Sequence, residues 1–235
     1  MRVVDSVVVI AVIGSSVLAS GCAVQHASRS SASARTTPTT TTTVARPLDE
    51  DGLKGLLLSP DQINPIMGAT EMEVTQKHIA LSDDSATMQP RECLAIDGAG
   101  QSEVYANTGY TAVREQTLRD GDHFAHYVDQ VVVLFPSAKR AADFFGIEAE
   151  AWPSCHEYTH TQSGSQWTAG PIAKADGVLS TVATQQNSGN DSPWACGRAL
   201  TARNNVVIDV NTCSADPKDT AAVIAGQIAA KVPVQ

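Results

Sequence analysis

Hydrophobic and polar side chains alternate over much of the chain between residues 110 and 214, and this period of two predicts β-strands. We expect strands at residues 110–118 and 123–135, joined by a short loop that contains Gly121. The second strand ends in five consecutive apolar residues, which predicts a central position in a sheet. Further strands are predicted at residues 155–162, 166–170 and 178–186.

The most regular part of this pattern is a hairpin at residues 194–214. Asn204 and Asn205 are predicted to form its two-residue turn, because Asn tolerates the positive φ that a type I′ turn requires. Counting outward from the turn places Cys196 directly opposite Cys213 in a non-hydrogen-bonded pair, where side chains are closest. The register therefore predicts a disulfide between these two cysteines.

The chain has five cysteines, and four of them lie in the predicted folded region. Once the hairpin has paired Cys196 with Cys213, Cys93 is left to pair with Cys155. Two disulfides are favoured over a zinc site, because the number is even, the N-terminus carries an export signal and no Cys-x-x-Cys sequence occurs.

Signals for helix starts flank the predicted strands. Ser59, Pro60 and Gln62 form a capping box that starts a short helix, and Gly68 is expected to close it. An apolar cluster with helical spacing precedes this helix at residues 53–58.

Two longer helices are predicted further along the chain. Ser137 caps the first, and Asp216 caps the second, with Pro217 as its first helical residue. Each has an apolar stripe: Ala138, Ala141, Ala142, Phe145 and Ala149 in the first, and Ala221, Ile224, Ala225, Ile228 and Val232 in the second. Because strands cluster between helices with hairpin-length connections, the predicted fold is α+β, an antiparallel β-sheet with packed helices.

The first fifty residues lack the pattern of a folded domain. Residues 1–21 place an apolar run and small residues before Cys22, which is typical of a secretory signal peptide. The run is shorter than the roughly 20 residues that a spanning helix needs, although a spanning anchor is the alternative. Residues 18–22 resemble the lipobox of bacterial lipoproteins, with Ala19 where a larger aliphatic residue is usual. Cys22 is therefore predicted to be lipidated, for instance with palmitate; a free or removed Cys22 is the alternative.

Residues 22–50 are rich in Ser and Thr and too polar to bury a core, so they are predicted to be a lipidated linker, either a plain flexible tether or an O-glycosylated one. The predicted organisation is thus a signal peptide at 1–21, the linker at 22–50 and one domain at 51–235. The protein is expected at the cell membrane, lipid-anchored on its extracytoplasmic face.

The formal net charge of −9 argues against a nucleic-acid partner or an anionic membrane surface, since both require clustered Lys and Arg. The predicted lipid, rather than charge, would hold the protein to the membrane.

One sequence could indicate catalysis. His156-Glu157-Tyr158-Thr159-His160 is an HExxH sequence, which in zinc peptidases places two ligands and a general base on one helix. Here the residue types favour a strand, Pro153 lies just upstream, and a third ligand is poorly supplied. We therefore predict no metal and no catalytic site, with a zinc-dependent hydrolase that uses His156, Glu157 and His160 as the alternative function.

Other chemical signals in the sequence are weak. Trp152, Trp167 and Trp194 are expected to pack in the core or at its rim, and they are the first candidates for lining a pocket. Asp209 and Asn211 lie on the same face of the hairpin as the predicted disulfide and are polar candidates for a ligand site.

Several stretches together resemble the PknH-like extracellular sensor domain, which is found on a mycobacterial kinase and in stand-alone mycobacterial lipoproteins. The matching stretches are Leu56-Leu57-Leu58, Ile66-Met67-Gly68, Cys93, Tyr110 to Arg114, Phe135-Pro136-Ser137, Trp152, Cys155, Cys196-Gly197-Arg198-Ala199-Leu200, Asn204 to Val210 and Cys213. The resemblance implies an α+β domain with an antiparallel sheet, two disulfides and a cleft for an unidentified ligand.

The sequence and the resemblance together predict a non-enzymatic, lipid-anchored, exported domain that binds or senses a ligand. No cofactor is expected, and the partner would be a small molecule or a molecule derived from the cell envelope. The 235 residues include no kinase domain, so we expect the protein not to relay a signal by phosphorylation itself.

Overall fold

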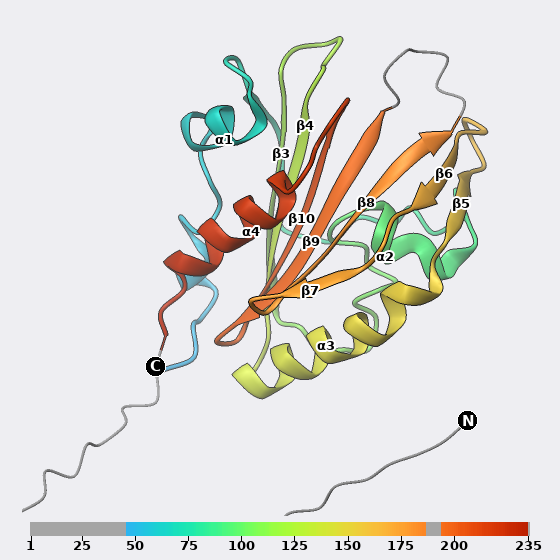
Figure 1. Ribbon diagram of the computed structural model, residues 1–235. Coiled ribbons are helices and arrows are strands. Elements are labelled where there is room, and N and C mark those ends of the chain that lie inside the picture. The colour runs from blue at the N-terminus through green and yellow to red at the C-terminus, as the bar shows by residue number, and fades with distance from the viewer. Residues whose placement is uncertain (1–45, 187–193, 235) are drawn as a thin grey trace, which may run out of the picture. The chain divides into compact units, whose positions relative to one another are not determined.

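The computed structural model describes residues 46–186 and 194–234, and Figure 1 shows their arrangement. Their centre is a ten-stranded sheet in the order β1-β3-β4-β10-β9-β8-β6-β5-β2, with β7 also paired to β8. All pairs of these strands are antiparallel. The strands are β1 (Glu73–His78), β2 (Met88–Gln89), β3 (Ala112–Arg119), β4 (Tyr127–Leu134), β5 (Glu157–His160), β6 (Gln166–Ala169), β7 (Ala173–Ala175), β8 (Val178–Gln186), β9 (Ala195–Arg203) and β10 (Val206–Ser214).

Helices cover both faces of the sheet (Figure 1). The α-helices are α1 (Pro60–Met67), α2 (Leu94–Asp97), α3 (Ala138–Ala151) and α4 (Thr220–Lys231), and three single 3-10 turns lie at Asp51–Leu53, Arg91–Cys93 and Trp152–Ser154. None of the helices in the described ranges is long and apolar enough to cross a membrane.

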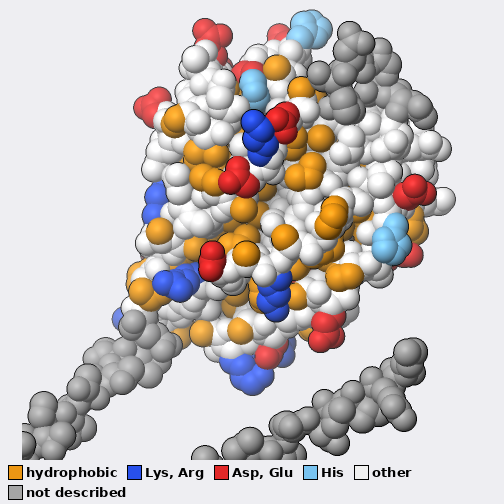
Figure 2. Space-filling view, viewed as in Figure 1, with side chains coloured by type: hydrophobic (Ala, Val, Ile, Leu, Met, Phe, Trp, Pro, Cys, Tyr) orange, Lys and Arg blue, Asp and Glu red, His pale blue; other side chains and the backbone are white. Residues whose placement is uncertain are grey.

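The sheet separates two hydrophobic cores. One core joins α1 and α4 to the sheet through residues such as Ile63, Ile224 and Ile208, and the other joins α2 and α3 through residues such as Phe144 and Val207. Side chains on a strand alternate between faces, so the apolar runs of β4 and β10 supply both cores. Figure 2 shows the face that carries α4, where apolar side chains gather near the middle and charged side chains of both signs are scattered among them.

The predicted hairpin is β9–β10, and its register places Cys213 opposite Cys196. The structure contains the Cys196–Cys213 disulfide and a second one between Cys93 and Cys155. The turn differs from the prediction, because among its two residues only Asn204 has a positive φ, of 51°. It is therefore not a type I′ turn, which needs positive φ at both positions.

The side chains of the turn bind both ends of the described chain. Asn205 accepts a hydrogen bond from the Leu48 backbone N–H at 2.7 Å and donates one to the Leu48 carbonyl at 2.9 Å. Asn204 Nδ2 donates to the carbonyls of Arg46 and Pro233 at 3.2 and 3.4 Å. Residues 46–48, at the end of the predicted linker, are thus bonded to the hairpin. The predicted signal peptide, Cys22 and most of the linker lie outside the described residues.

The cap signals of two helices agree with the structure. Gln62 Oε1 accepts from the Ser59 N–H at 3.2 Å at the start of α1, and Gly68, with a φ of 70°, ends this helix. Ser137 Oγ accepts from the Arg140 N–H at 3.3 Å at the start of α3.

Three helix predictions are wrong in detail. Residues 53–58 do not continue as a helix, because the turn at Asp51–Leu53 ends at once and Gly55 has a φ of 81°. The last helix begins at Thr220 rather than after Asp216, because Lys218 has a φ of 48°, which is not helical. The buried stripe of α3 includes Phe144 and Glu148, whereas Phe145 is only partly buried. Strands β1, β2 and β7 had no clear signal in the sequence.

Candidate functional site

A cleft of about 320 Å³ lies on the α2–α3 face of the sheet, near the Cys196–Cys213 disulfide. Inward-facing residues of seven strands line it: Gln76, Glu115, Thr117, Arg119, Tyr127, Asp129, His160, Trp167, Cys196, Asn211 and Cys213. Residues outside the strands complete it: Ser82, Asp84, Asp97, Gly98, Ala99, Gln101, Phe124 and Trp194. The cleft thus joins segments that are far apart in the sequence, which is typical of a binding site built on a sheet.

Two buried carboxyl groups lie in the sheet part of the cleft. Glu115 on β3 and Asp129 on β4 are only 5% and 7% exposed. Thr117 Oγ1 donates a long hydrogen bond of 3.4 Å to Asp129, and Glu115 Oε2 has no hydrogen-bond partner among the described residues. Burial raises the pKa of Glu115, and burial together with the charge of Glu115 raises the pKa of Asp129 well above its usual value.

Aromatic rings form a wall beside these carboxyl groups. The ring of Phe124 lies 6.2 Å from that of Tyr127 and 6.0 Å from that of Trp194. The guanidinium carbon of Arg119 lies 4.7 Å from the Phe124 ring centre and 5.5 Å from that of Tyr127, which are cation–π distances. Two rings of this wall, Phe124 and Tyr127, therefore already contact a cationic side chain of the protein, Arg119.

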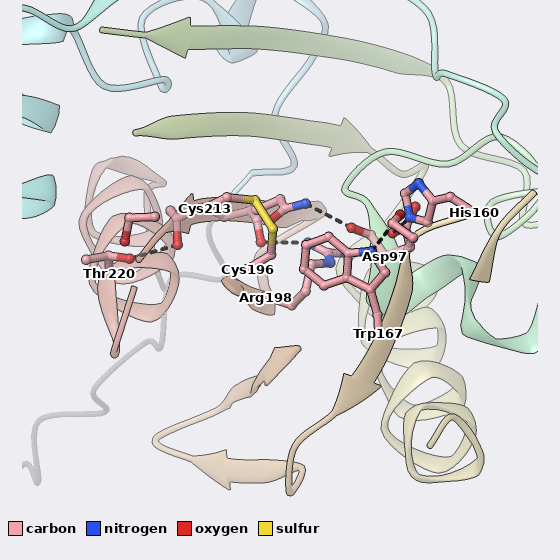
Figure 3. The surroundings of a disulfide bond; sticks show 12 residues. Asp97, His160, Trp167, Cys196, Arg198, Cys213 and Thr220 are labelled. Carbon is pink, nitrogen blue, oxygen red and sulfur yellow. Dashed lines mark hydrogen bonds and ion pairs between the residues drawn. A yellow bond between two sulfur atoms is a disulfide. The ribbon is translucent and has the colours of Figure 1, made fainter. Parts of the chain in front are cut away.

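A second wall carries an ion pair between Asp97 and His160. His160 Nε2 lies 2.6 Å from Asp97 Oδ1, and the hydrogen bond raises the pKa of the imidazole more than partial burial lowers it. The His160 ring also packs 6.0 Å from the ring of Trp167. Asn211 Nδ2 donates to the Asp97 carbonyl at 2.9 Å and so connects this wall to β10. Figure 3 shows His160, Asp97 and Trp167 on one side of the disulfide, with Thr220 of α4 on the other.

A buried network of charged side chains holds residues 95–105, part of which line the cleft, against the sheet. Arg198, which is 1% exposed, donates to Asp209 Oδ1 at 2.7 Å and twice to the Ala95 carbonyl, at 2.9 and 3.1 Å. Asp209 Oδ2 accepts from the Gly100 N–H at 2.9 Å and from the Tyr105 hydroxyl at 3.0 Å. These bonds tie residues 95–105 to the central hairpin, and Asp97 to Gln101 of the cleft lie in that segment.

The HExxH sequence does not form a zinc site in this fold. Residues 157–160 are strand β5, so His156 and His160 lie about 13 Å apart along an extended chain, too far to bind one ion. His156 is exposed, and His160 is bonded to Asp97. Over residues 46–186 and 194–234, no group of three His, Cys, Asp or Glu side chains is arranged to hold a metal. The zinc-hydrolase alternative is therefore rejected.

The other candidates divide between core and cleft. Trp152 is in the core, where its indole N–H donates to Glu148 at 3.2 Å, whereas Trp167 and Trp194 line the cleft. Asn211 also lines the cleft. The prediction for Asp209 is wrong, because Arg198 holds its carboxylate in the interior.

Sequence reasoning missed the two carboxyl groups of the cleft. Their signal was present, because Glu115 alternates with Val113 and Thr117 on the inward face of β3, and Asp129 precedes Val131 on the inward face of β4. A charged residue at an inward strand position breaks the pattern expected of a core and points to a functional site.

Comparisons with known proteins identify relatives of this domain. A family model described as PknH-like extracellular domain matches residues 48–231. Serine/threonine-protein kinase PknH of Mycobacterium bovis is 32% identical over 192 residues, which are 80% of this chain and 31% of that protein. The PknH kinase of Mycobacterium tuberculosis H37Rv is 32% identical over 192 residues, 80% of this chain and 30% of the kinase. The chain thus spans about a third of the length of these curated relatives.

A solved structure gives the same result for the fold. The crystal structure of the extracellular domain of PknH from Mycobacterium tuberculosis matches with a TM-score of 0.74 and 31% sequence identity. The match covers 79% of this chain and 97% of that one. It confirms the predicted fold class, an antiparallel sheet with packed helices and two disulfides.

Proposed function

Because the chain belongs to the PknH-like extracellular domain family, as its sequence predicted, we propose that it is a non-enzymatic, exported domain that binds a ligand in the cleft. The observation that carries the proposal is the composition of the cleft. It combines two buried carboxyl groups, one of them with an oxygen that has no partner in residues 46–186 and 194–234, with a wall of aromatic rings. Concave sites in which convergent polar groups lie beside aromatic rings are typical of small-molecule binding.

The proposal includes a place for the protein in the cell. The predicted lipid on Cys22 would anchor it to the extracytoplasmic face of the cell membrane, so the ligand would be a small molecule or a product of the cell envelope. Two disulfides are compatible with that oxidising compartment.

Native mass spectrometry of the protein isolated from its own cell envelope tests this function. We expect a stoichiometric small molecule to accompany the protein. A Trp194→Ala variant should lose it, because this partly buried ring lines the cleft, and a Val223→Ala variant on the exposed side of α4 should keep it. Isolation of the unmodified protein without any bound molecule, or retention of the molecule by Trp194→Ala, would contradict the proposal.

A further inference from the structure

The geometry points to a ligand of one charge class: we infer that the cleft binds an organic cation, an ammonium or guanidinium group on an aromatic or apolar body, with Glu115 and Asp129 as its charge partners. This inference rests on the proposed function and specifies what the cleft would take.

The lining of the cleft is acidic. It contains four carboxyl groups, those of Asp84, Asp97, Glu115 and Asp129, and a single guanidinium, that of Arg119. The one imidazole in the lining, His160, is already bonded to Asp97. When Glu115 and Asp129 are ionised, this lining repels an anion and attracts a cation, and the low dielectric of a cleft strengthens both effects.

The four carboxyl groups differ in how they are satisfied. Asp97 has His160 as its partner, and Asp84 accepts from the Gln101 side chain at 2.8 Å. Asp129 has only the long 3.4 Å bond from Thr117, and Glu115 Oε2 has no partner among the described residues. A buried carboxylate oxygen without a donor is costly, so Glu115 and Asp129 are the groups that a ligand's N–H donors would satisfy.

Among the described residues, neither Glu115 nor Asp129 has an ion-pair partner. Arg119 faces the rings of Phe124 and Tyr127 and, within the described residues, makes no ion pair with either carboxylate. Arg198 is bound to Asp209, and His78, opposite Glu115 on β1, makes only a 3.4 Å contact with Gln76. Burial raises the pKa of Glu115, the charge of His78 lowers it, and the carboxylates of Asp209 and Asp84 raise it further.

The size and the walls of the cleft favour an organic cation over a metal ion. A hard metal ion such as Ca²⁺ takes six or more oxygen ligands, and among the described residues no group of three His, Cys, Asp or Glu side chains could hold a metal ion. Beside the two buried carboxyl groups lie the rings of Phe124, Tyr127 and Trp194, and the Arg119 guanidinium shows that two of these rings already face a cation. An ammonium placed at the carboxylates would therefore extend its apolar body along this wall.

Isothermal titration calorimetry of the full-length protein in detergent tests the inference with three probes of similar shape. Phenethylamine is a cation, 2-phenylethanol is neutral and 3-phenylpropionate is an anion. We expect phenethylamine to bind at least about tenfold more tightly than the other two, because only it supplies a charged donor to the carboxylates. Its affinity should fall when the salt concentration rises.

Two variants and one control test whether the carboxyl groups of Glu115 and Asp129 bind phenethylamine. Glu115→Gln and Asp129→Asn keep the shape of each side chain and remove its charge, so each should weaken phenethylamine binding by about tenfold to one hundredfold. Glu157→Gln makes the same change of net charge on an exposed side chain of β5 outside the cleft and should leave the affinity unchanged. Thermal melts of all three confirm that each variant is folded before it is titrated.

The outcomes separate this inference from the proposed function. The inference of a cationic ligand would be overturned if the three probes bound with equal affinity or if phenethylamine did not bind. It would also be overturned if Glu157→Gln weakened phenethylamine binding as much as the two cleft variants do. Tighter binding of 2-phenylethanol or 3-phenylpropionate that disappears in Trp194→Ala would also overturn it, while leaving the cleft as a binding site. The native mass spectra test the proposed function separately: if no molecule is isolated together with the protein, the proposed function is wrong.

Discussion

The buried pair of Arg198 and Asp209 should contribute more to stability than any surface ion pair of the domain. Substituting Arg198→Leu removes four hydrogen bonds: two to the Ala95 carbonyl, one of 2.6 Å to the Val210 carbonyl and one to Asp209. The Asp209 carboxylate then stays buried with only the Gly100 N–H and the Tyr105 hydroxyl as donors.

The expected loss of stability follows from the Asp209 charge that Arg198 no longer compensates. Removing one partner of a buried ion pair costs about 3–5 kcal/mol, which is a large part of the roughly 5–15 kcal/mol by which a typical protein is stable. Adding Asp209→Asn to Arg198→Leu removes the charge but keeps an acceptor for Gly100 and Tyr105. We therefore expect the double variant to be less destabilised than the sum of the two single variants by about 2 kcal/mol.

Urea denaturation followed by tryptophan fluorescence measures these free energies of unfolding. The control is Arg114→Leu, which breaks a partly exposed pair with Glu50 and should cost about 1 kcal/mol or less. If Arg198→Leu cost no more than this control, or if the two substitutions at Arg198 and Asp209 were additive within about 0.5 kcal/mol, the structural role of the buried pair would be refuted.

Three further predictions concern the cleft and the disulfides. Glu115→Gln should raise the free energy of unfolding at neutral pH by about 1 kcal/mol, because it removes a buried charge with a raised pKa. The gain should disappear near pH 4, where the unfolded Glu is also protonated, and a loss of stability at pH 7 in urea titrations would contradict the argument. The Asp97 bond raises the pKa of His160, so its contribution is complete below the ordinary His pKa of about 6.5 and is lost as the pH rises through the higher folded value. Melts should therefore show Asp97→Asn to be more destabilising at pH 6 than at pH 9, and an equal or reversed effect would exclude this linkage. Reduction of the disulfides, which close 17 and 62 residues, should cost about 3 and about 4 kcal/mol, and an unchanged melting temperature in reductant would show that they contribute little.

Local signals predicted most of the fold. The β9–β10 register followed from the two-residue turn and the alternation around it, because pairing in a hairpin is determined by residues close in sequence. The caps at Ser59 and Ser137 are likewise local. The start of α4 was misplaced because a left-handed Lys218 interrupts the chain after Pro217, and Lys carries no sequence signal for that conformation.

The site was less predictable, because it depends on contacts between distant segments. Nothing near Asp209 in the sequence shows that Arg198 and Tyr105 would bury its carboxylate, and nothing near His160 shows that Asp97 would become its partner. Glu115 and Asp129 are the exceptions, since a charge at an inward strand position is visible in the alternation itself.

The contacts of the β9–β10 turn determine where the chain enters the domain relative to the cleft. Asn204 and Asn205 hold Arg46 and Leu48, so the chain enters the domain at the turn end of the hairpin. The cleft lies at the other end of the same strands, by Cys196, about 23 Å along an extended chain. Residues 46–48 are therefore bound at the end of the hairpin opposite the cleft, and they take no part in its lining.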